Sequence, residues 1–177
     1  MQPMFTIHIG EFLVGEYINR KLGKEFEVWV PTKDTGVDLL LTRKKSLGKV
    51  VRLQAKFSRG FGLSKRELEA FGWFTLNPKK ILASAADFWV FVILPPSRKP
   101  SFIVVPIEEL KKRIPGDCHG TWHLYLKVTK EGKCFNTRGL PREEANQLMR
   151  GRVDRPLQDF SLFVNKRGFQ NVMGHYH

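Results

Sequence analysis

Residues 37–58 read VDLLLTRKKSLGKVVRLQAKFS, and this stretch predicts two neighbouring β-strands joined by a turn. Apolar and polar residues alternate over 37–43 and again over 49–58, and this period of two is typical of strands. The Lys-Lys-Ser-Leu-Gly segment between them has the composition of a hairpin turn. The stretch therefore predicts an antiparallel pair of strands.

The two strands bring polar side chains to one face. Gln54 and Lys56 are two residues apart and share a face of the second strand. If the strands pair as a hairpin, Asp38 of the first strand lies on that face as well. A carboxylate, an amide oxygen and an ammonium group are then predicted to converge on adjacent strands.

A helix is predicted upstream, from Ile9 to Leu22, with Gly23 ending it. Its core-facing stripe is apolar except for Glu11. A carboxylate in such a stripe is costly unless it is paired or binds a metal, so Glu11 is a candidate for the same site. Glu16 is the alternative helix carboxylate, on a more polar face of the helix.

These residue types suit a hard cation beside a phosphate. Mg²⁺ prefers oxygen ligands, commonly one or two carboxylates with waters and substrate phosphate. Asp38 is the expected central ligand, with Glu11 and Gln54 beside it. Lys56 is placed to stabilise negative charge in a transition state or to orient water.

The remaining sequence predicts a mixed series of helices and strands. In chain order they are a strand at Phe26–Val30, a helix from Ser64 to about Thr75, strands at Asp87–Leu94 and Ser101–Val105, a helix at Ile107–Ile114, a strand near Trp122–Val128 and a helix at Pro141–Arg150. The helix after Ser64 is predicted because Glu67 completes a capping box. This order predicts an α/β (α+β) protein with a central mixed sheet flanked by helices on both sides.

The ordered set Gly10-Glu11, Gly36-Val37-Asp38 and Gln54-Ala55-Lys56, with 15 residues between Asp38 and Gln54, resembles the PD-(D/E)XK nuclease superfamily. It is most similar to the Mrr-type restriction enzymes, which carry a G-x-D…Q-x-K variant. The resemblance covers roughly the first 60 residues. It implies a restriction endonuclease-like fold and Mg²⁺-dependent hydrolysis of DNA phosphodiesters, with Mn²⁺ as a substitute.

The resemblance assigns Asp38, Gln54 and Lys56 to the catalytic strand positions and Glu11 to the helix position. Two residues depart from the commonest pattern. Val37 precedes Asp38 where a proline is usual, and Gln54 replaces an acid. The second change removes a negative charge and is expected to weaken metal binding.

The composition favours a polyanionic partner. The 177 residues include 30 Lys or Arg and 17 Asp or Glu, for a formal charge of +13. Nucleic acid is the first expectation and an anionic membrane surface the second. With 42% hydrophobic residues the chain can build a core, so a largely disordered chain is excluded.

From Arg43 to Arg66, both included, the sequence has nine basic residues and no acidic residue. The predicted DNA contacts come from this region and are Arg43, Lys44, Lys45, Arg52, Ser58, Arg59, Lys65 and Arg66. Three tryptophans, Trp73, Trp89 and Trp122, are predicted to be core residues rather than a stacking surface.

The sequence as a whole favours one nuclease domain over 1–177, with a core at about 5–115 and an extension at 116–177. The expected function is a metal-dependent DNA endonuclease that acts as a homodimer, because one site cuts one strand. Two alternatives remain: a weak or inactive DNA-binding module of the same fold, and a Holliday-junction resolvase or repair nuclease. No signal peptide, membrane span, disulfide framework or small-molecule substrate is predicted, so a cytoplasmic location is expected.

Overall fold

The computed structural model describes residues 8–32, 35–60, 68–96, 99–116 and 120–175. Its elements in chain order are α1 (Ile9–Leu22), β1 (Phe26–Trp29), β2 (Leu39–Arg43), β3 (Ser46–Arg59), β4 (Leu68–Leu76), α2 (Pro78–Leu82), β5 (Phe88–Leu94), β6 (Ser101–Pro106), α3 (Ile107–Lys112), β7 (Trp122–Thr129), β8 (Cys134–Asn136), α4 (Arg142–Met149), the 3-10 turn η1 (Ser161–Phe163) and α5 (Asn165–Gly174). No helix in these ranges combines the length and the apolar character needed to cross a membrane.

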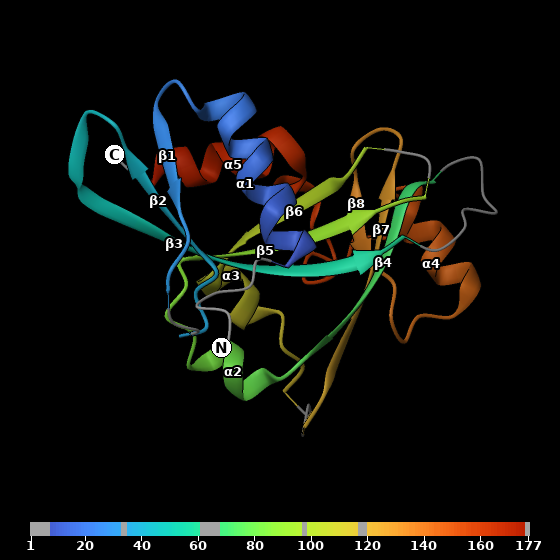
Figure 1. The fold of residues 1–177 in the computed structure, drawn as a ribbon. Coiled ribbons are helices and arrows are strands. Elements are labelled where there is room, and N and C mark those ends of the chain that lie inside the picture. The colour runs from blue at the N-terminus through green and yellow to red at the C-terminus, as the bar shows by residue number, and fades with distance from the viewer. Residues whose placement is uncertain (1–7, 33–34, 61–67, 97–98, 117–119, 176–177) are drawn as a thin grey trace.

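The strands form two sheets (Figure 1). The central sheet has the order β1-β2-β3-β5-β6, in which β3 and β5 are parallel and the other neighbours are antiparallel. The second sheet has the antiparallel order β4-β7-β8. The predicted hairpin is the β2–β3 pair, and the predicted α/β class with a central mixed sheet is confirmed.

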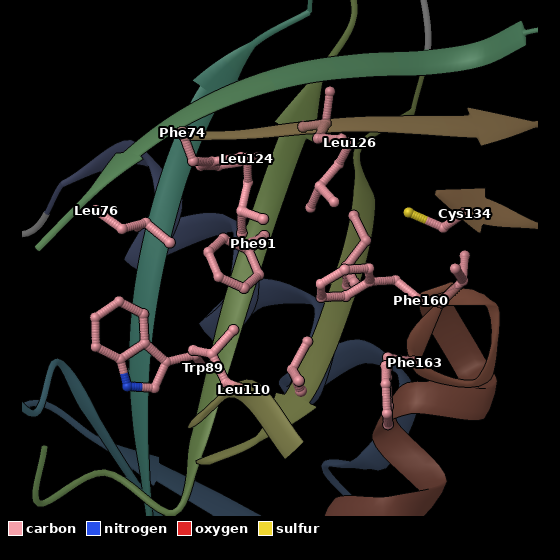
Figure 2. Packing of buried hydrophobic residues seen from close by; sticks show 14 of the residues in the cluster. Phe74, Leu76, Trp89, Phe91, Leu110, Leu124, Leu126, Cys134, Phe160 and Phe163 are labelled. Atoms are coloured by element: carbon pink, nitrogen blue, oxygen red, sulfur yellow. The ribbon is translucent and has the colours of Figure 1, made fainter. Parts of the chain in front are cut away.

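The two faces of the central sheet are covered differently. On one face, Val14 and Ile18 of α1 pack with Leu53 of β3 and Phe169 of α5. On the other face, side chains of the second sheet meet β5, together with Leu110 of α3 and the segment around η1 (Figure 2). Helices lie on both sides, as predicted, but one side also carries a sheet, and the C-terminal segment contributes to both clusters.

The predicted helix from Ser64 to about Thr75 is wrong in its described part, because residues 68–76 form β4. Buried and less buried residues alternate along β4, which is the period of a strand. Gly72 permits close approach of β4 to β5, since a Cβ there would lie 2.7 Å from Ile93 Cγ1. Packing against β5 outweighs the local capping signal, whose residues 64–67 lie outside the described ranges.

The N-terminal predictions agree with the structure, with small differences. The α1 helix has the predicted bounds, and Gly23 follows its last residue. β2 begins at Leu39 rather than Val37, and Val37 packs in the cluster opposite to that of Leu39. The sequence predicts Pro106 at the first position of the helix that follows, but it lies just before the first turn of α3, as its N-cap. Sequence reasoning did not predict α2, β8 or α5.

Candidate active site

The four residues predicted to form the site, Glu11, Asp38, Gln54 and Lys56, line one pocket of about 920 Å³. It is lined by the start of α1, the residues that lead into β2, part of β3 and the segment from the end of β4 through α2. Glu16 does not line this pocket; it is exposed and pairs with Arg20 at 3.3 Å. The structure therefore favours Glu11 over Glu16 as the helix carboxylate of this pocket.

Asp38 and Gln54 are in direct contact. The Gln54 side-chain amide donates a hydrogen bond of 2.7 Å from Nε2 to Asp38 Oδ2. The Ala55 backbone N–H donates to the same oxygen, also at 2.7 Å. Gln54 is only 7% exposed, so its amide meets Asp38 largely out of contact with bulk water.

The end of the β2–β3 ladder explains this contact. Among the described residues, β2 pairs with β3 from Arg43 back to Leu39, which lies opposite Leu53. The next backbone N–H of β3 on this edge belongs to Ala55, and a buried N–H needs an acceptor. The Asp38 carboxylate accepts from this N–H in place of the backbone carbonyl that a further β2 residue would supply. The end of the ladder therefore holds the Asp38 carboxylate in position.

Glu11 is held at the first turn of α1. Its Oε2 accepts a hydrogen bond of 3.1 Å from the His8 backbone N–H, which satisfies one of the unpaired donors at the helix start. Gly10 brings this turn against β3, because a Cβ there would lie 3.0 Å from Phe57 Cβ. The close packing places the helix carboxylate beside the strand that carries Gln54 and Lys56.

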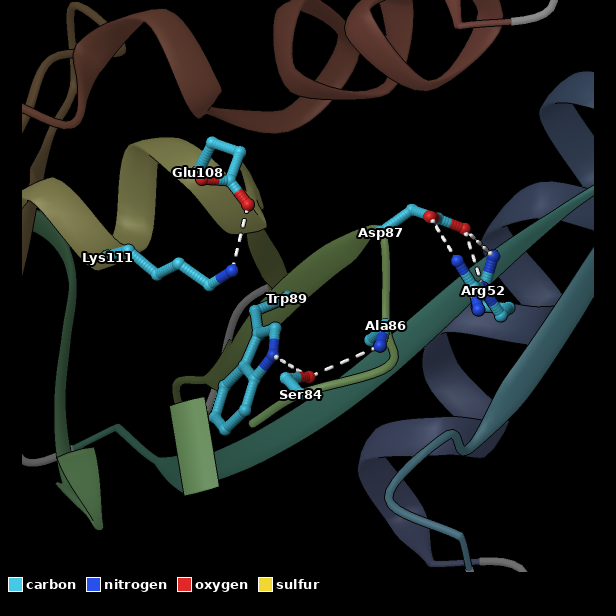
Figure 3. A network of polar contacts seen from close by, with 7 residues as sticks. All are labelled: Arg52, Ser84, Ala86, Asp87, Trp89, Glu108 and Lys111. Atoms are coloured by element: carbon cyan, nitrogen blue, oxygen red, sulfur yellow. Dashed lines mark hydrogen bonds and ion pairs between the residues drawn. The ribbon is translucent and has the colours of Figure 1, made fainter. Parts of the chain in front are cut away.

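Lys56 lies on the same face of β3 as Gln54, and its ammonium is 5.5 Å from the centroid of the Trp89 ring. The Trp89 indole N–H donates to Ser84 Oγ at 3.0 Å, and the Ala86 N–H donates to the same oxygen (Figure 3). Trp89 is 4% exposed, so its ring is a fixed support beneath the lysine.

Sequence reasoning missed the wall opposite β3. Thr75, Asn77, Lys80 and Ser84 line the pocket there, and His8 lines it beside α1. Asn77 caps α2 by accepting from the Lys79 backbone N–H at 2.9 Å. An Asn followed by proline marks a helix start in the sequence, but nothing in the sequence indicates that this turn faces Asp38.

The predicted DNA-contact residue Arg52 is engaged within the protein. Its guanidinium forms an ion pair with Asp87 at 2.8 Å, and its backbone N–H also donates to that carboxylate (Figure 3). Partial burial acts to raise the pKa of the Asp87 carboxyl, but the hydrogen bonds and charge from Arg52 outweigh it and hold that pKa below its ordinary value. The pair joins β3 to the start of β5.

The other predicted DNA contacts that the structure describes differ in their surroundings. Ser58 is buried, and its hydroxyl accepts from the Trp73 backbone N–H at 3.0 Å, so it is a structural residue. Arg43 lies 3.8 Å from Glu25, at the opposite end of β2 from Asp38. The exposed members are Lys44, Lys45 and Arg59, whereas Lys65 and Arg66 lie outside the described residues.

The donor set of the pocket suits a divalent cation with few protein ligands. Among the described residues, no group of three or more His, Cys, Asp and Glu side chains is placed to hold a metal. The pocket offers the carboxylates of Glu11 and Asp38 and, beside Asp38, the amide of Gln54, and Mg²⁺ commonly binds one or two carboxylates with waters and phosphate. A half-turn of the Gln54 amide would set its oxygen against Asp38 Oδ2, an arrangement that a cation favours.

No protein-family model matches the chain, and no curated protein sequence matches it. Among solved structures, the chain is similar to a Holliday junction resolvase, Hjc, from the archaeal hyperthermophile Archaeoglobus fulgidus. The two chains share 10% sequence identity, and the similarity covers 84% of this chain and 100% of the other with a TM-score of 0.35.

Proposed function

We propose that this protein is a metal-dependent DNA endonuclease of the restriction endonuclease-like fold that hydrolyses phosphodiester bonds. The observation that carries the proposal is the direct contact between Asp38 and Gln54, with Lys56 on the same strand face and Glu11 in the same pocket. The formal charge of +13 supports DNA as the substrate.

The residues that would hold the metal are Glu11, Asp38 and Gln54, with Mg²⁺ as the expected ion and Mn²⁺ as a substitute. When bound, a divalent cation neutralises phosphate charge and makes a bound water easier to deprotonate. The hydrogen bonds from Ala55 and Gln54 orient the Asp38 carboxylate in the pocket. In Glu11, Oε2 accepts the hydrogen bond from the His8 backbone N–H, and this bond does not involve Oε1.

Lys56 is the proposed electrostatic group. Lys56 lines the pocket, and its ammonium carries the positive charge that a pentacovalent phosphate needs as negative charge develops. Trp89 holds that ammonium by a cation–π contact, so little reorganisation is needed when a phosphate arrives. Lys80, across the pocket, is a second cation within the same space and is a candidate contact to the DNA backbone.

A second candidate function is DNA binding without cleavage. The observation that favours it is the Gln54 amide, which donates to Asp38 and so satisfies the carboxylate without a cation. A neutral residue also supplies less attraction for a metal than an acid does. Both candidates require DNA binding, and only hydrolysis separates them.

A supercoiled-plasmid nicking assay with Mg²⁺ or Mn²⁺ tests the proposal. We expect Asp38→Asn to abolish nicking and Lys56→Met to slow it on the order of 10²–10³-fold, because Lys56 acts on the developing charge. Both variants should bind DNA in EDTA with nearly the affinity of the original protein. Glu11→Gln should also lower the rate and the affinity for Mn²⁺ measured by calorimetry.

Two control variants match these substitutions. Glu16→Gln changes a carboxylate on the same helix, and Lys49→Met removes an exposed lysine from the same strand; neither lines the pocket. Both should nick at the rate of the original protein. DNA binding without metal-dependent nicking would favour the second candidate, and full activity of purified Asp38→Asn would refute the proposed site. Measurement of the molecular mass in solution, with and without DNA, tests whether the protein acts as the expected homodimer.

A further inference from the structure

The outward face of the second sheet carries aromatic and basic side chains. On β4, buried residues alternate with Phe71, Trp73 and Thr75, which point away from the core. Across the ladder, Trp73 lies opposite Tyr125 and Thr75 opposite His123. Trp73 is 46% exposed, which contradicts its predicted place in the core, whereas Trp89 and Trp122 are buried at 4% and 5%.

The aromatic rings form a connected group with fixed orientations. The Trp73 ring lies 5.6 Å from Tyr125 and 6.0 Å from His123, centroid to centroid, and Phe71 lies 6.3 Å from Tyr125. The Trp73 indole N–H donates to His123 Nδ1 at 3.3 Å. A half-exposed tryptophan whose polar end is already bonded offers ring surface at a small entropic cost.

Two cations lie over these rings. The Arg138 guanidinium is 4.9 Å from the Tyr125 ring and donates to the Tyr125 hydroxyl at 3.1 Å. The Lys127 ammonium is 5.8 Å from the Phe71 ring. Glu69 is the one acidic residue of β4 and β7. Aromatic rings interleaved with positive charge match a ligand that carries flat bases on an anionic backbone.

The same face leads into the candidate active site. Thr75 follows Trp73 on the outward face of β4, and Thr75, Leu76 and Asn77 line the pocket that holds Asp38. A DNA strand whose bases stack on Trp73 can therefore continue along β4 into the pocket. In duplex DNA the bases are stacked on one another and their faces are not available, so this route suits an unpaired strand.

We propose that this face, defined by Phe71, Trp73, His123, Tyr125, Lys127 and Arg138, binds a single-stranded DNA segment by stacking its bases. In naming DNA with an unpaired strand as the substrate class of the nuclease, the inference rests on the proposed function. The binding itself requires no metal and is measured without one.

The test is fluorescence anisotropy with the full chain in EDTA, using a labelled single-stranded 20-mer of mixed sequence and its duplex as probes. We expect Trp73→Ala to weaken single-strand binding roughly 5- to 150-fold and duplex binding less than about twofold, because stacking is lost only for unpaired bases. Trp29→Ala is the matched control: Trp29 is 53% exposed, but it lies on β1 of the central sheet. It should change neither affinity by more than about twofold.

Arg138→Gln provides a second variant on the exposed surface in case Trp73→Ala does not fold, as judged by circular dichroism. It should weaken single-strand binding and lower the salt dependence by about one unit of log–log slope if Arg138 also contacts a phosphate. Unchanged single-strand affinity in a folded Trp73→Ala protein, an equal loss in Trp29→Ala, or an equal loss for duplex would overturn the inference. If Trp73→Ala does not fold, unchanged single-strand affinity in Arg138→Gln would overturn it as well.

The two proposals fail separately. Asp38→Asn should retain single-strand binding in EDTA because Asp38 is not part of the stacking face. If the stacking face fails this test while the original protein nicks plasmid, only the inference about unpaired DNA is lost. If single-strand binding depends on Trp73 but no metal supports nicking, the proposed hydrolysis is lost and the binding face stands.

Discussion

Replacing Gln54 with glutamate probes the candidate metal site through stability rather than catalysis. Gln54 is 7% exposed and its amide donates to Asp38 Oδ2 at 2.7 Å. Gln54→Glu retains the shape of the side chain but replaces the donated N–H with a second negative charge. The metal-free protein should lose stability, and a bound divalent cation should restore it.

The expected loss follows from two effects. A hydrogen bond to a charged acceptor contributes about 1.5–3 kcal/mol, and the substitution removes it. Two carboxylates about 4 Å apart repel by about 4 kcal/mol at an effective dielectric constant near 20. Sharing a proton between the carboxyls relieves part of this repulsion. We therefore expect the free energy of unfolding in EDTA to fall by about 1.5 kcal/mol if a shared proton relieves all of the repulsion, and by up to about 7 kcal/mol if it relieves none.

Metal should act in the opposite direction on this variant. A carboxylate in place of the amide adds a charged oxygen ligand, which lowers the dissociation constant for Mg²⁺ or Mn²⁺. Each tenfold decrease in that constant adds about 1.4 kcal/mol of stabilisation at saturating metal. Urea unfolding at pH 8, followed by circular dichroism in EDTA and in about 10 mM Mg²⁺, measures both the loss of stability without metal and its recovery with metal. About this concentration suffices for a site of millimolar affinity.

Gln147→Glu is the matched control. Gln147 donates to the Glu143 carboxylate at 3.4 Å on the exposed side of α4, so the same substitution places two carboxylates together away from the pocket. It should cost only about 0.2–0.5 kcal/mol and should not respond to metal. If Gln54→Glu matched the original protein in EDTA, or if metal stabilised both variants equally, the assignment of Asp38 and Gln54 to one cation site would be refuted.

Three further predictions concern the scaffold. The pKa of Asp87 lies below its ordinary value, so its ion pair with Arg52 stabilises the fold at pH values above the ordinary carboxyl pKa. Asp87→Asn should therefore lower the free energy of unfolding by about 1 kcal/mol at pH 7, and this difference from the original protein should shrink below about pH 4 in urea unfolding. Gly72→Ala should destabilise the protein by about 1–3 kcal/mol in urea unfolding, whereas Gly48→Ala, with nothing within 4 Å of its Cβ, should change stability by less than about 0.5 kcal/mol. Burial raises the pKa of the Cys134 thiol, so peptide mapping should find it unlabelled by maleimide in the native protein at pH 8 and labelled in urea.

The hairpin and first helix were predictable because local patterns and tertiary packing agree there. Alternation over 49–58 predicted that Gln54 and Lys56 share a strand face, and the cation–π contact of Lys56 with Trp89 lies on that face. The apolar stripe of α1 predicted the buried side of the helix, and Glu11 lies at its start. Strand and helix periods are properties of short segments, so sequence alone reveals them.

The second sheet was not predictable by the same reasoning. The capping signal at Ser64 and Glu67 favoured a helix, but β4 forms because it pairs with β7, about 50 residues later in the chain. The exposure of Trp73 follows from that pairing, since a helix and a strand place its side chain differently. The stacking face thus depends on contacts between distant segments.

By itself the sequence determined the positive charge of the protein, the β2–β3 pair and which residues share a face of β3, because charge and side-chain period belong to the chain locally. Only the tertiary structure decided that the β2–β3 ladder ends at Leu39, so that the Asp38 carboxylate accepts a hydrogen bond from the Ala55 N–H. It alone also decided that Thr75, at the end of β4, and Asn77, just after it, line the same pocket. Where a ladder ends and which segment crosses above it depend on packing between distant parts of the chain, and no local pattern encodes that choice.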